Sequence, residues 1–431
     1  MPRKLTGFAV VWLLWLLVGP SQTAFPEDWP RWGGPRGDET WKAPKLPERW
    51  PEAGLPPVWS VPIGGGYGGV AVVADRVYVM DHVREPIEQE RLLCFDARTG
   101  ERLWTHAYEV QYGKLDYGNG PRGTPTVDRE KVYTLGAVGR VCCVDAARGD
   151  LLWTKNFPKE YGANPPIPTW GLAASPLLWE DLVITHPGAD GGGCLIAFHR
   201  DTGDEVWRAS EDPAGYATPI LIASPSGPLL VSWTPENVLG LNPRTGQIHW
   251  SIPYKVNYGV SIATPIYHDE ILFVTGYWEG SKAIRLGKKP SDATLLWEEN
   301  RFLRGLMAQP LYRKGHVYTL DKSHGLTCFQ LATGKKLWDD KHQTTPRGRN
   351  PQATLVWLED EDRAIILNEL GELILARLNP QGYHERSRTR IIEPRERSPI
   401  WAHPAYAGSR VYARSDTELV CVELGAKKTA Q

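Results

Sequence analysis

The feature that most constrains this chain is a motif of 13 residues that recurs five times. In each copy an alternating apolar stretch leads into a turn, and a tryptophan follows four residues after the glycine of that turn. The copies are residues 92–104, 141–153, 195–207, 238–250 and 326–338. Alternation is typical of a strand with one buried face, and a polar turn that ends in glycine is typical of a hairpin. We therefore expect each copy to be a β-hairpin with its tryptophan at a fixed place on the second strand.

A second pair of strands is predicted before each hairpin. These pairs begin with a proline, which a strand tolerates at its first position, at Pro125, Pro176, Pro265, Pro310 and Pro404. Successive hairpin tryptophans lie 41 to 54 residues apart, which is close to the period of four-stranded propeller blades. Two less regular units contain Trp297 and Arg386, the latter placed where the tryptophan is expected. The sequence thus predicts an all-β fold, a single closed β-propeller of about eight four-stranded blades.

The two ends of the repeat region complement each other. The last unit, which ends at Gly425, lacks a tryptophan strand, whereas the strand around Trp59 has no hairpin partner before it. Pairing these strands would complete the last blade and remove exposed sheet edges. We expect the N-terminal strand around Trp59 to close the ring.

The first residues have the features of a secretory signal. Arg3 and Lys4 precede an apolar run from Phe8 to Val18, and small residues follow it up to Ala24. The alternative is a retained membrane anchor. We predict a signal peptide at 1–24, an extended segment at 25–56, the propeller at 57–425 and a tail at 426–431. The mature chain is then exported, periplasmic or extracellular, without a spanning helix, and we expect a monomer.

The charge balance argues against a nucleic-acid partner. The chain has 49 basic and 50 acidic residues, whereas nucleic-acid binding requires a basic patch. Its 11 histidines do not occur at metal-ligand spacing with cysteines or carboxylates. We therefore predict no metal site from the sequence itself.

With these motifs, the chain resembles the pyrroloquinoline-quinone-type (quinoprotein-like) β-propeller repeat family over about residues 57–425. The resemblance implies that the tryptophans dock between adjacent blades, at Trp59, Trp104, Trp153, Trp207, Trp250, Trp297 and Trp338. Some members of the family are dehydrogenases that hold the quinone and Ca²⁺ over the central funnel. Others are non-catalytic scaffolds, such as the propeller lipoprotein of the outer-membrane protein assembly machinery.

The adjacent Cys142 and Cys143 allow two interpretations. A vicinal disulfide beside a cofactor is one. The repeat favours the other, because the position six residues before the turn glycine holds Cys94, Cys143, Ala197, Gly240 and Cys328. A small buried residue is expected there, and cysteine behaves as one.

The segments that lead into the inner strands should line one mouth of the channel. Loops on a rigid scaffold commonly carry function, and aromatic, Asn and Arg side chains can hold a planar or anionic ligand. The alternative is that these side chains merely fill the channel. The candidate ligand-binding residues are Tyr67, Asn119, Arg122, Trp170, Tyr216, Asn257, Tyr258, Arg304, Arg347, Asn350, Trp401 and His403.

Two functions follow from this pattern. The first is an exported non-catalytic propeller that binds a protein, peptide or glycan partner through its channel mouth and blade loops, with no cofactor. The alternative is an alcohol or sugar dehydrogenase that uses pyrroloquinoline quinone with Ca²⁺. A pair of carboxylates converging at the channel mouth would favour the dehydrogenase, and Asp116 and Asp190 are the loop acids placed to form it. We predict no catalytic residue.

Overall fold

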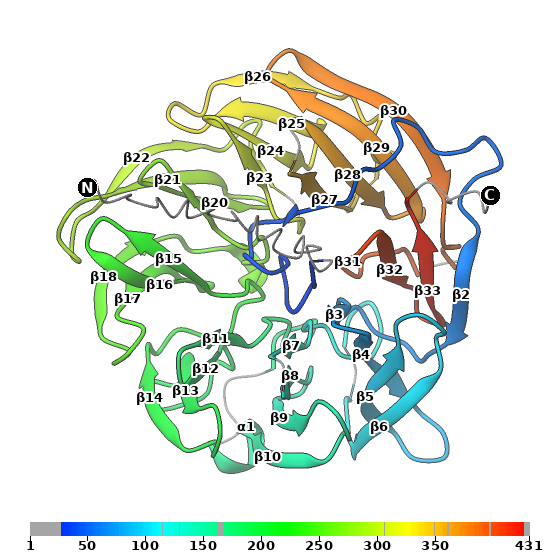
Figure 1. Cartoon of the computed structure of the whole chain (residues 1–431). Helices are drawn as coiled ribbons and strands as arrows, with labels where there is room; N and C mark the ends of the chain where they lie inside the picture. The colour runs from blue at the N-terminus through cyan, green and yellow to red at the C-terminus, as the bar shows by residue number, and fades with distance from the viewer. Residues whose placement is uncertain are drawn as a thin grey trace, which may run out of the picture.

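The computed structural model describes residues 27–425 except 114, 129, 162–166, 306, 349, 360–361 and 396–397. The predicted signal peptide and C-terminal tail therefore lie outside the described residues. Within that part of the chain, eight four-stranded antiparallel units form a ring around a central channel (Figure 1). The predicted all-β propeller of about eight blades is confirmed. No helix among the described residues is long and apolar enough to cross a membrane.

The blades follow one another along the chain, each running from an inner to an outer strand. Blade 1 contains β3 (Ala71–Val73), β4 (Arg76–Val83), β5 (Gln89–Asp96) and β6 (Arg102–Glu109). Blade 2 contains β7 (Thr126–Val127), β8 (Lys131–Leu135), β9 (Arg140–Asp145) and β10 (Leu151–Asn156), followed by the short helix α1 (Phe157–Glu160). Blade 3 contains β11 (Leu177–Trp179), β12 (Leu182–Thr185), β13 (Leu195–His199) and β14 (Glu205–Ala209). Blade 4 contains β15 (Ile220–Ser224), β16 (Gly227–Trp233), β17 (Asn237–Leu241) and β18 (Ile248–Pro253).

The second half of the ring repeats this order. The 3₁₀ turn η1 (Asn257–Gly259) precedes blade 5, which contains β19 (Ile266–His268), β20 (Ile271–Gly276), β21 (Gly280–Leu286) and β22 (Ala293–Glu299). Blade 6 contains β23 (Leu311–Arg313), β24 (His316–Asp321), β25 (Gly325–Gln330) and β26 (Lys336–Asp339). Blade 7 contains β27 (Ala353–Leu358), β28 (Arg363–Asn368), β29 (Glu372–Asn379) and β30 (Gly382–Arg390).

Blade 8 is built from both ends of the repeat region. It contains β31 (Ala405–Ala407), β32 (Arg410–Arg414) and β33 (Glu418–Glu423), and its outer strand is β2 (Pro57–Pro62). Strand β2 pairs antiparallel with β33, with Trp59 opposite Cys421. In Figure 1 the blue β2 accordingly lies beside the red β33.

The hairpin turns have the geometry that their sequence predicts. In blade 1 the Asp96 carboxylate accepts hydrogen bonds from the backbone N–H groups of Arg98 and Thr99, and Gly100 has a φ of 74°. Each tryptophan lies opposite the small residue of the repeat, as Trp104 lies opposite Cys94. Because the indole needs room across the pair, that position takes Cys, Ala or Gly. Cys142 and Cys143 are both buried free thiols.

The hairpin tryptophans join neighbouring blades. The Trp104 indole N–H donates to the Ala146 carbonyl of blade 2 at 3.2 Å, and a Cβ on Gly149 would lie 2.6 Å from the Trp104 ring. The glycine thus leaves the space that the ring occupies. Equivalent indole-to-carbonyl hydrogen bonds to the next blade are made by Trp59, Trp153, Trp207, Trp297 and Trp338. Trp250 packs tightly on Gly240 of its own blade and shares a hydrophobic cluster with Leu272 and Ile284 of blade 5.

Blade 7 corrects one sequence prediction. A bulge shifts the β29–β30 register, so that Leu375 faces Ser387 and Ala376 faces Glu385. By comparison with the other blades, Ser387 occupies the tryptophan position and Arg386 does not. The Ser387 hydroxyl accepts a hydrogen bond from the backbone N–H of the buried Trp50. Trp50, which precedes the first blade in the chain, therefore lies beside a blade whose hairpin has no tryptophan.

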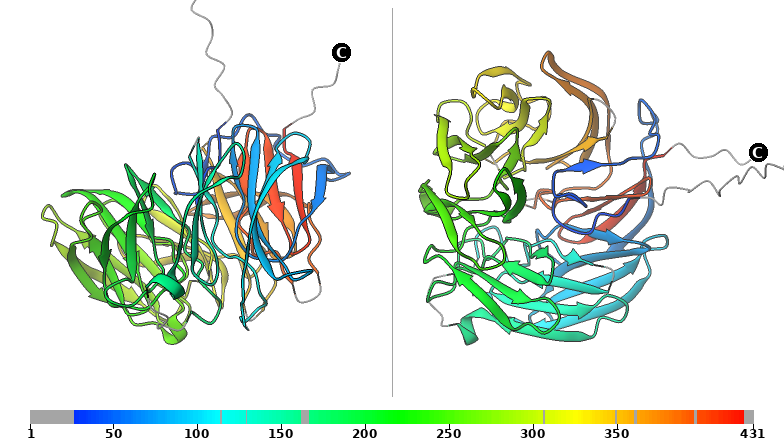
Figure 2. Two further views of the ribbon diagram at one scale, coloured as in Figure 1. Left: turned by 90° about the horizontal axis from the view of Figure 1, so that it is seen from below. Right: turned by 60° about the vertical axis from the view of Figure 1, so that its left-hand side comes forward.

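Residues 27–50, here called the N-terminal segment, are built into the ring. Trp29 and Val72 of β3 exchange two backbone hydrogen bonds of 2.8 Å, and the Pro30 carbonyl accepts from Val127 of β7 at 2.8 Å. Further on, β1 (Thr40–Trp41) pairs parallel with β27. The segment thus crosses the channel from blades 1 and 2 to blade 7. Figure 1 shows it in blue in the middle of the ring, and Figure 2 shows the same segment from two other sides.

Candidate functional site: the channel-mouth pocket

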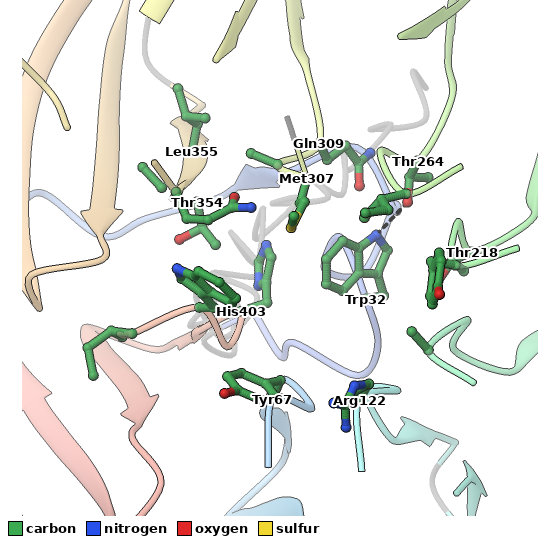
Figure 3. Close-up of a pocket in the computed structure, with 18 of the residues that line it drawn as sticks. Trp32, Tyr67, Arg122, Thr218, Thr264, Met307, Gln309, Thr354, Leu355 and His403 are labelled. Atoms are coloured by element: carbon green, nitrogen blue, oxygen red, sulfur yellow. Dashed lines mark hydrogen bonds between the residues drawn. The ribbon is translucent and has the colours of Figure 1, made fainter. Parts of the chain in front are cut away.

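The loops that lead into the inner strands surround a cavity of about 160 Å³ at the centre of the ring. This cavity, which we call the channel-mouth pocket, is drawn in Figure 3. Because each blade contributes its loop at the same end of the channel, residues distant in sequence converge there. Of the predicted ligand-binding residues, six line it, namely Tyr67, Arg122, Trp170, Tyr216, Trp401 and His403.

Aromatic rings form a continuous wall of the pocket. Trp170 lies 5.1 Å from Tyr216 and 6.0 Å from Tyr117, measured between ring centroids. Tyr117 in turn lies 5.2 Å from Trp401, and Trp401 lies 5.9 Å from Tyr67. Burial raises the pKa of both Tyr67 and Tyr216 to about 12, so their hydroxyls stay protonated at neutral pH. The wall is therefore an uncharged surface for stacking.

Arg122 is held in the pocket wall by its own loop. Its guanidinium donates to the backbone carbonyls of Gly120 at 2.5 Å, Gly118 at 2.8 Å and Asp116 at 3.1 Å. It also lies 5.3 Å from the centroid of the Tyr67 ring. Burial lowers the pKa of Arg122 from its ordinary value, although the group remains a cation at neutral pH. Three of its five N–H donors are thus engaged by the backbone.

A buried ion pair joins the N-terminal segment to blade 8 at the pocket wall. The His403 Nε2 lies 2.8 and 2.9 Å from the two carboxylate oxygens of Glu39, and Nδ1 lies 2.7 Å from the Pro404 carbonyl. Glu39 is 1% exposed and His403 is 4% exposed. Burial lowers the pKa of His403, but Glu39 and the Pro404 carbonyl outweigh it and the net pKa is raised. With an acceptor at each ring nitrogen, the imidazole is held as the cation.

Trp32 of the N-terminal segment divides the channel. Its indole N–H donates to the Thr264 hydroxyl at 2.9 Å, the bond dashed in Figure 3. The ring lines the channel-mouth pocket on one side and a second cavity of about 300 Å³ on the other. Arg31 and Arg36 line that second cavity. The N-terminal segment therefore forms a partition across the channel.

The other six candidate residues lie outside the pocket lining. The Asn119 amide donates to Glu88, and Asn257 donates to Glu279 through both its backbone N–H and its side chain. Tyr258 is 83% exposed beside Trp278. The Arg304 guanidinium donates to the Asn300 carbonyl, Arg347 is exposed, and Asn350 donates to the Tyr117 hydroxyl at 2.8 Å in an adjoining surface cavity.

Sequence reasoning missed several pocket residues. Trp32 and Glu39 belong to the non-repeating N-terminal segment, whose Trp- and Gly-rich composition was the signal available. Tyr117 lies in the same loop as Arg122 and could have been chosen with it. Gln309 and Gln352 stand where other repeats have Thr-Pro or Ser-Pro, at the start of an inner strand.

The comparison with known proteins decides the family. A family model described as outer membrane protein assembly factor BamB matches residues 88–288 and 236–430. The chain belongs to this family. The predicted membership of the quinoprotein-like propeller repeats is thereby confirmed, and no curated protein sequence matches the chain.

Solved structures of both functional kinds share the fold. BamB from Moraxella catarrhalis has 17% identity and a TM-score of 0.58 over 88% of this chain and 99% of that chain. A europium-containing methanol dehydrogenase has 11% identity and a TM-score of 0.67 over 92% and 98%. A quinohemoprotein alcohol dehydrogenase from Comamonas testosteroni has 12% identity and a TM-score of 0.62 over 94% and 81%. Such low identities establish the fold only.

The pocket residues do not fit a quinone with Ca²⁺. Ca²⁺ takes six to eight oxygen ligands, yet among the described residues Glu39 is the one acid that lines the pocket, and His403 holds both its oxygens. Asp116 and Asp190 do not line it, so no carboxylate pair from the described part of the chain converges there. No group of three or more His, Cys, Asp or Glu suited to a metal occurs in the described part of the chain. Pyrroloquinoline quinone is also a tricarboxylate, and three of the five N–H donors of Arg122 are already engaged by backbone carbonyls.

Proposed function

We propose that this chain is an exported, non-catalytic propeller that binds a protein partner through the channel-mouth pocket and the loops around it. The family description, an outer membrane protein assembly factor, supports a protein as the partner rather than a glycan. The leader-like residues 1–24 support export, and we propose that the mature chain acts as a monomer.

The observation that carries the proposal is the chemistry of the pocket. Among the residues described, the aromatic part of its wall is uncharged, its one acid is tied to His403, and its arginine is tied to backbone carbonyls. General acid–base catalysis requires a group that is free to exchange a proton with a substrate. Stacking and apolar contact require only the exposed rings, and both are characteristic of protein interfaces.

In-cell photo-cross-linking tests the proposal. A benzoylphenylalanine at Tyr117, which is 45% exposed at the pocket, is compared with one at Leu151, which is 46% exposed on the outer strand β10. We expect a discrete protein adduct from position 117 and none from position 151. Equal labelling from both positions, or none from either, would contradict binding through the channel mouth.

A titration tests the dehydrogenase alternative. The purified exported chain is titrated with pyrroloquinoline quinone and Ca²⁺, and dye-linked oxidation of alcohols and aldoses is then assayed. Neither saturable binding nor turnover is expected. Micromolar quinone binding accompanied by turnover would overturn the non-catalytic assignment.

A further inference from the structure

Some side chains that line the channel-mouth pocket carry buried polar atoms that no other described residue satisfies. Gln309 is 5% exposed and Gln352 is 6% exposed, and both line the pocket. Among the described residues, the Gln309 Oε1, the Gln352 Nε2 and the Thr354 Oγ1 are buried and have no hydrogen-bond partner. The Gln309 amide is fixed in orientation, because its Nε2 donates to the Gly37 carbonyl at 3.1 Å. Figure 3 shows Gln309 and Thr354 among the side chains around the cavity.

These atoms offer one acceptor and one donor to the backbone of a bound peptide. An unpaired amide oxygen accepts one N–H, and an unpaired amide nitrogen donates to one carbonyl. A peptide unit offers both in one planar group. Because a buried polar atom without a partner is costly, a ligand or an ordered water that bonds these atoms would be favoured.

Size and polarity restrict the rest of the ligand. A cavity of about 160 Å³ has room for on the order of ten waters, which is close to the number of non-hydrogen atoms in a phenylalanine side chain with one peptide unit. Most of the remaining lining is apolar, and besides the aromatic wall it includes Ile262, Met307 and Leu355. A hexose carries a hydroxyl on nearly every carbon, and this lining would leave most of them unsatisfied.

We propose that the channel-mouth pocket binds one large apolar side chain, aromatic for preference, from an extended segment of the partner protein, with Gln309 and Gln352 bonding the adjoining peptide unit. This inference rests on the proposed function and specifies what the site recognises. Arg122 contributes little to the choice of side chain, because three of its five N–H donors are bound to its own loop.

Synthetic peptides test the inference. Acetyl-Ala-Ala-Phe-Ala-Ala-amide and its versions with Leu, Ala or Glu at the centre are titrated into the full chain by ligand-observed NMR. Burying the ring should make the Phe peptide bind about tenfold or more tightly than the Ala peptide, with Leu next and Glu weakest. Equal binding of the Phe and Ala peptides would overturn the inference.

Two kinds of variant locate the binding. Ala173→Phe places a ring in the pocket from a half-buried loop position and should abolish Phe-peptide binding. Gln352→Leu and Thr354→Val remove unpaired polar atoms, so they should weaken binding about three- to tenfold without lowering the melting temperature. Binding that survives Ala173→Phe, or a loss of stability that matches the loss of affinity, would contradict the assignment.

The outcomes also distinguish this inference from the proposed function on which it rests. A protein adduct at Tyr117 without side-chain preference leaves the proposed function standing and removes the inference. Displacement of the Phe peptide by a neutral methyl hexoside would assign the pocket to a glycan instead. Self-association that Ala173→Phe abolishes would assign it to a second copy of the chain. Quinone binding with turnover would remove both proposals.

Discussion

The blades and the N-terminal segment are stabilised in opposite ways. Among the described residues, five of the eight blade joints repeat the same contact, a tryptophan over the glycine of the next turn with its indole N–H on a neighbouring carbonyl, as between Trp104 and Gly149. The N-terminal segment makes each of its contacts once, through Trp29 on β3, Trp32 on Thr264 and Glu39 on His403.

This difference distinguishes the contacts that build the ring from those that form the channel-mouth pocket. A repeated joint makes the ring, and the loss of one joint leaves the others in place. The pocket depends on single-copy contacts, since Trp32 partitions the channel and Glu39 holds the wall. We therefore expect substitutions in the N-terminal segment to act on the site and those in the joints to act locally on one blade.

The largest effect is expected at the buried ion pair. His403→Leu leaves the Glu39 carboxylate buried without its partner, which should cost about 3–5 kcal/mol of unfolding free energy. Lys42→Met is the matched control on the same segment, because its pair with Glu359 is more than half exposed, and should cost under about 1 kcal/mol. Denaturant unfolding measures both. Similar costs for the two variants would show that burial of the pair is immaterial.

Glycines under tryptophan rings provide the second comparison. Gly149→Ala in a joint and Gly34→Ala in the N-terminal segment would each place a Cβ within 3 Å of an indole, at φ values of 81° and 79°. Both should cost about 1–3 kcal/mol more than Gly315→Ala, which has a φ of 80° and open space around it. Thermal unfolding of the three variants checks this. A Gly34 variant as stable as the Gly315 control would mean that the segment is loosely packed.

A smaller effect is expected with pH. Because the folded pKa of His403 is raised, its contribution to stability is complete below the unfolded value near 6.5 and is lost as the pH rises through the folded pKa. The wild-type chain should therefore lose stability from pH 6 to 9 relative to the double variant Glu39→Met/His403→Leu, which has neither group. Denaturant unfolding across that range measures the difference, and a constant difference would refute the charged pair.

The smallest effect is expected for the cysteines. Burial raises the pKa of Cys142 to about 11 and that of Cys143 to about 12, so neither forms a reactive thiolate at neutral pH. Iodoacetamide should leave the native chain unlabelled and should label all six cysteines after unfolding. Mass spectrometry counts the labels. Fewer than six under denaturing, non-reducing conditions would indicate a disulfide.

The repeat made the blades predictable from the sequence, whereas contacts that occur only once in the molecule were missed. The turn glycines and tryptophans recur at fixed spacing, so the blades and their order could be derived. The Glu39–His403 contact joins residues 364 positions apart without any periodic signal. The placement of Arg386 at the tryptophan position was wrong because β29 and β30 stay paired down to Asn379 and Gly382, so this hairpin is longer than that of blade 1 and a count of four residues from the glycine falls one residue short.

Amide hydrogen exchange tests most directly whether the N-terminal segment completes the site. The backbone N–H groups of Trp29 and Glu39 donate to Val72 and Gly33, and β1 pairs with β27. Peptides covering residues 27–41 should therefore be protected to the same extent as those covering β27 at 353–358. Exchange of residues 27–41 within seconds, with the blades still protected, would show that the channel-mouth pocket is not closed by this segment and would contradict the account.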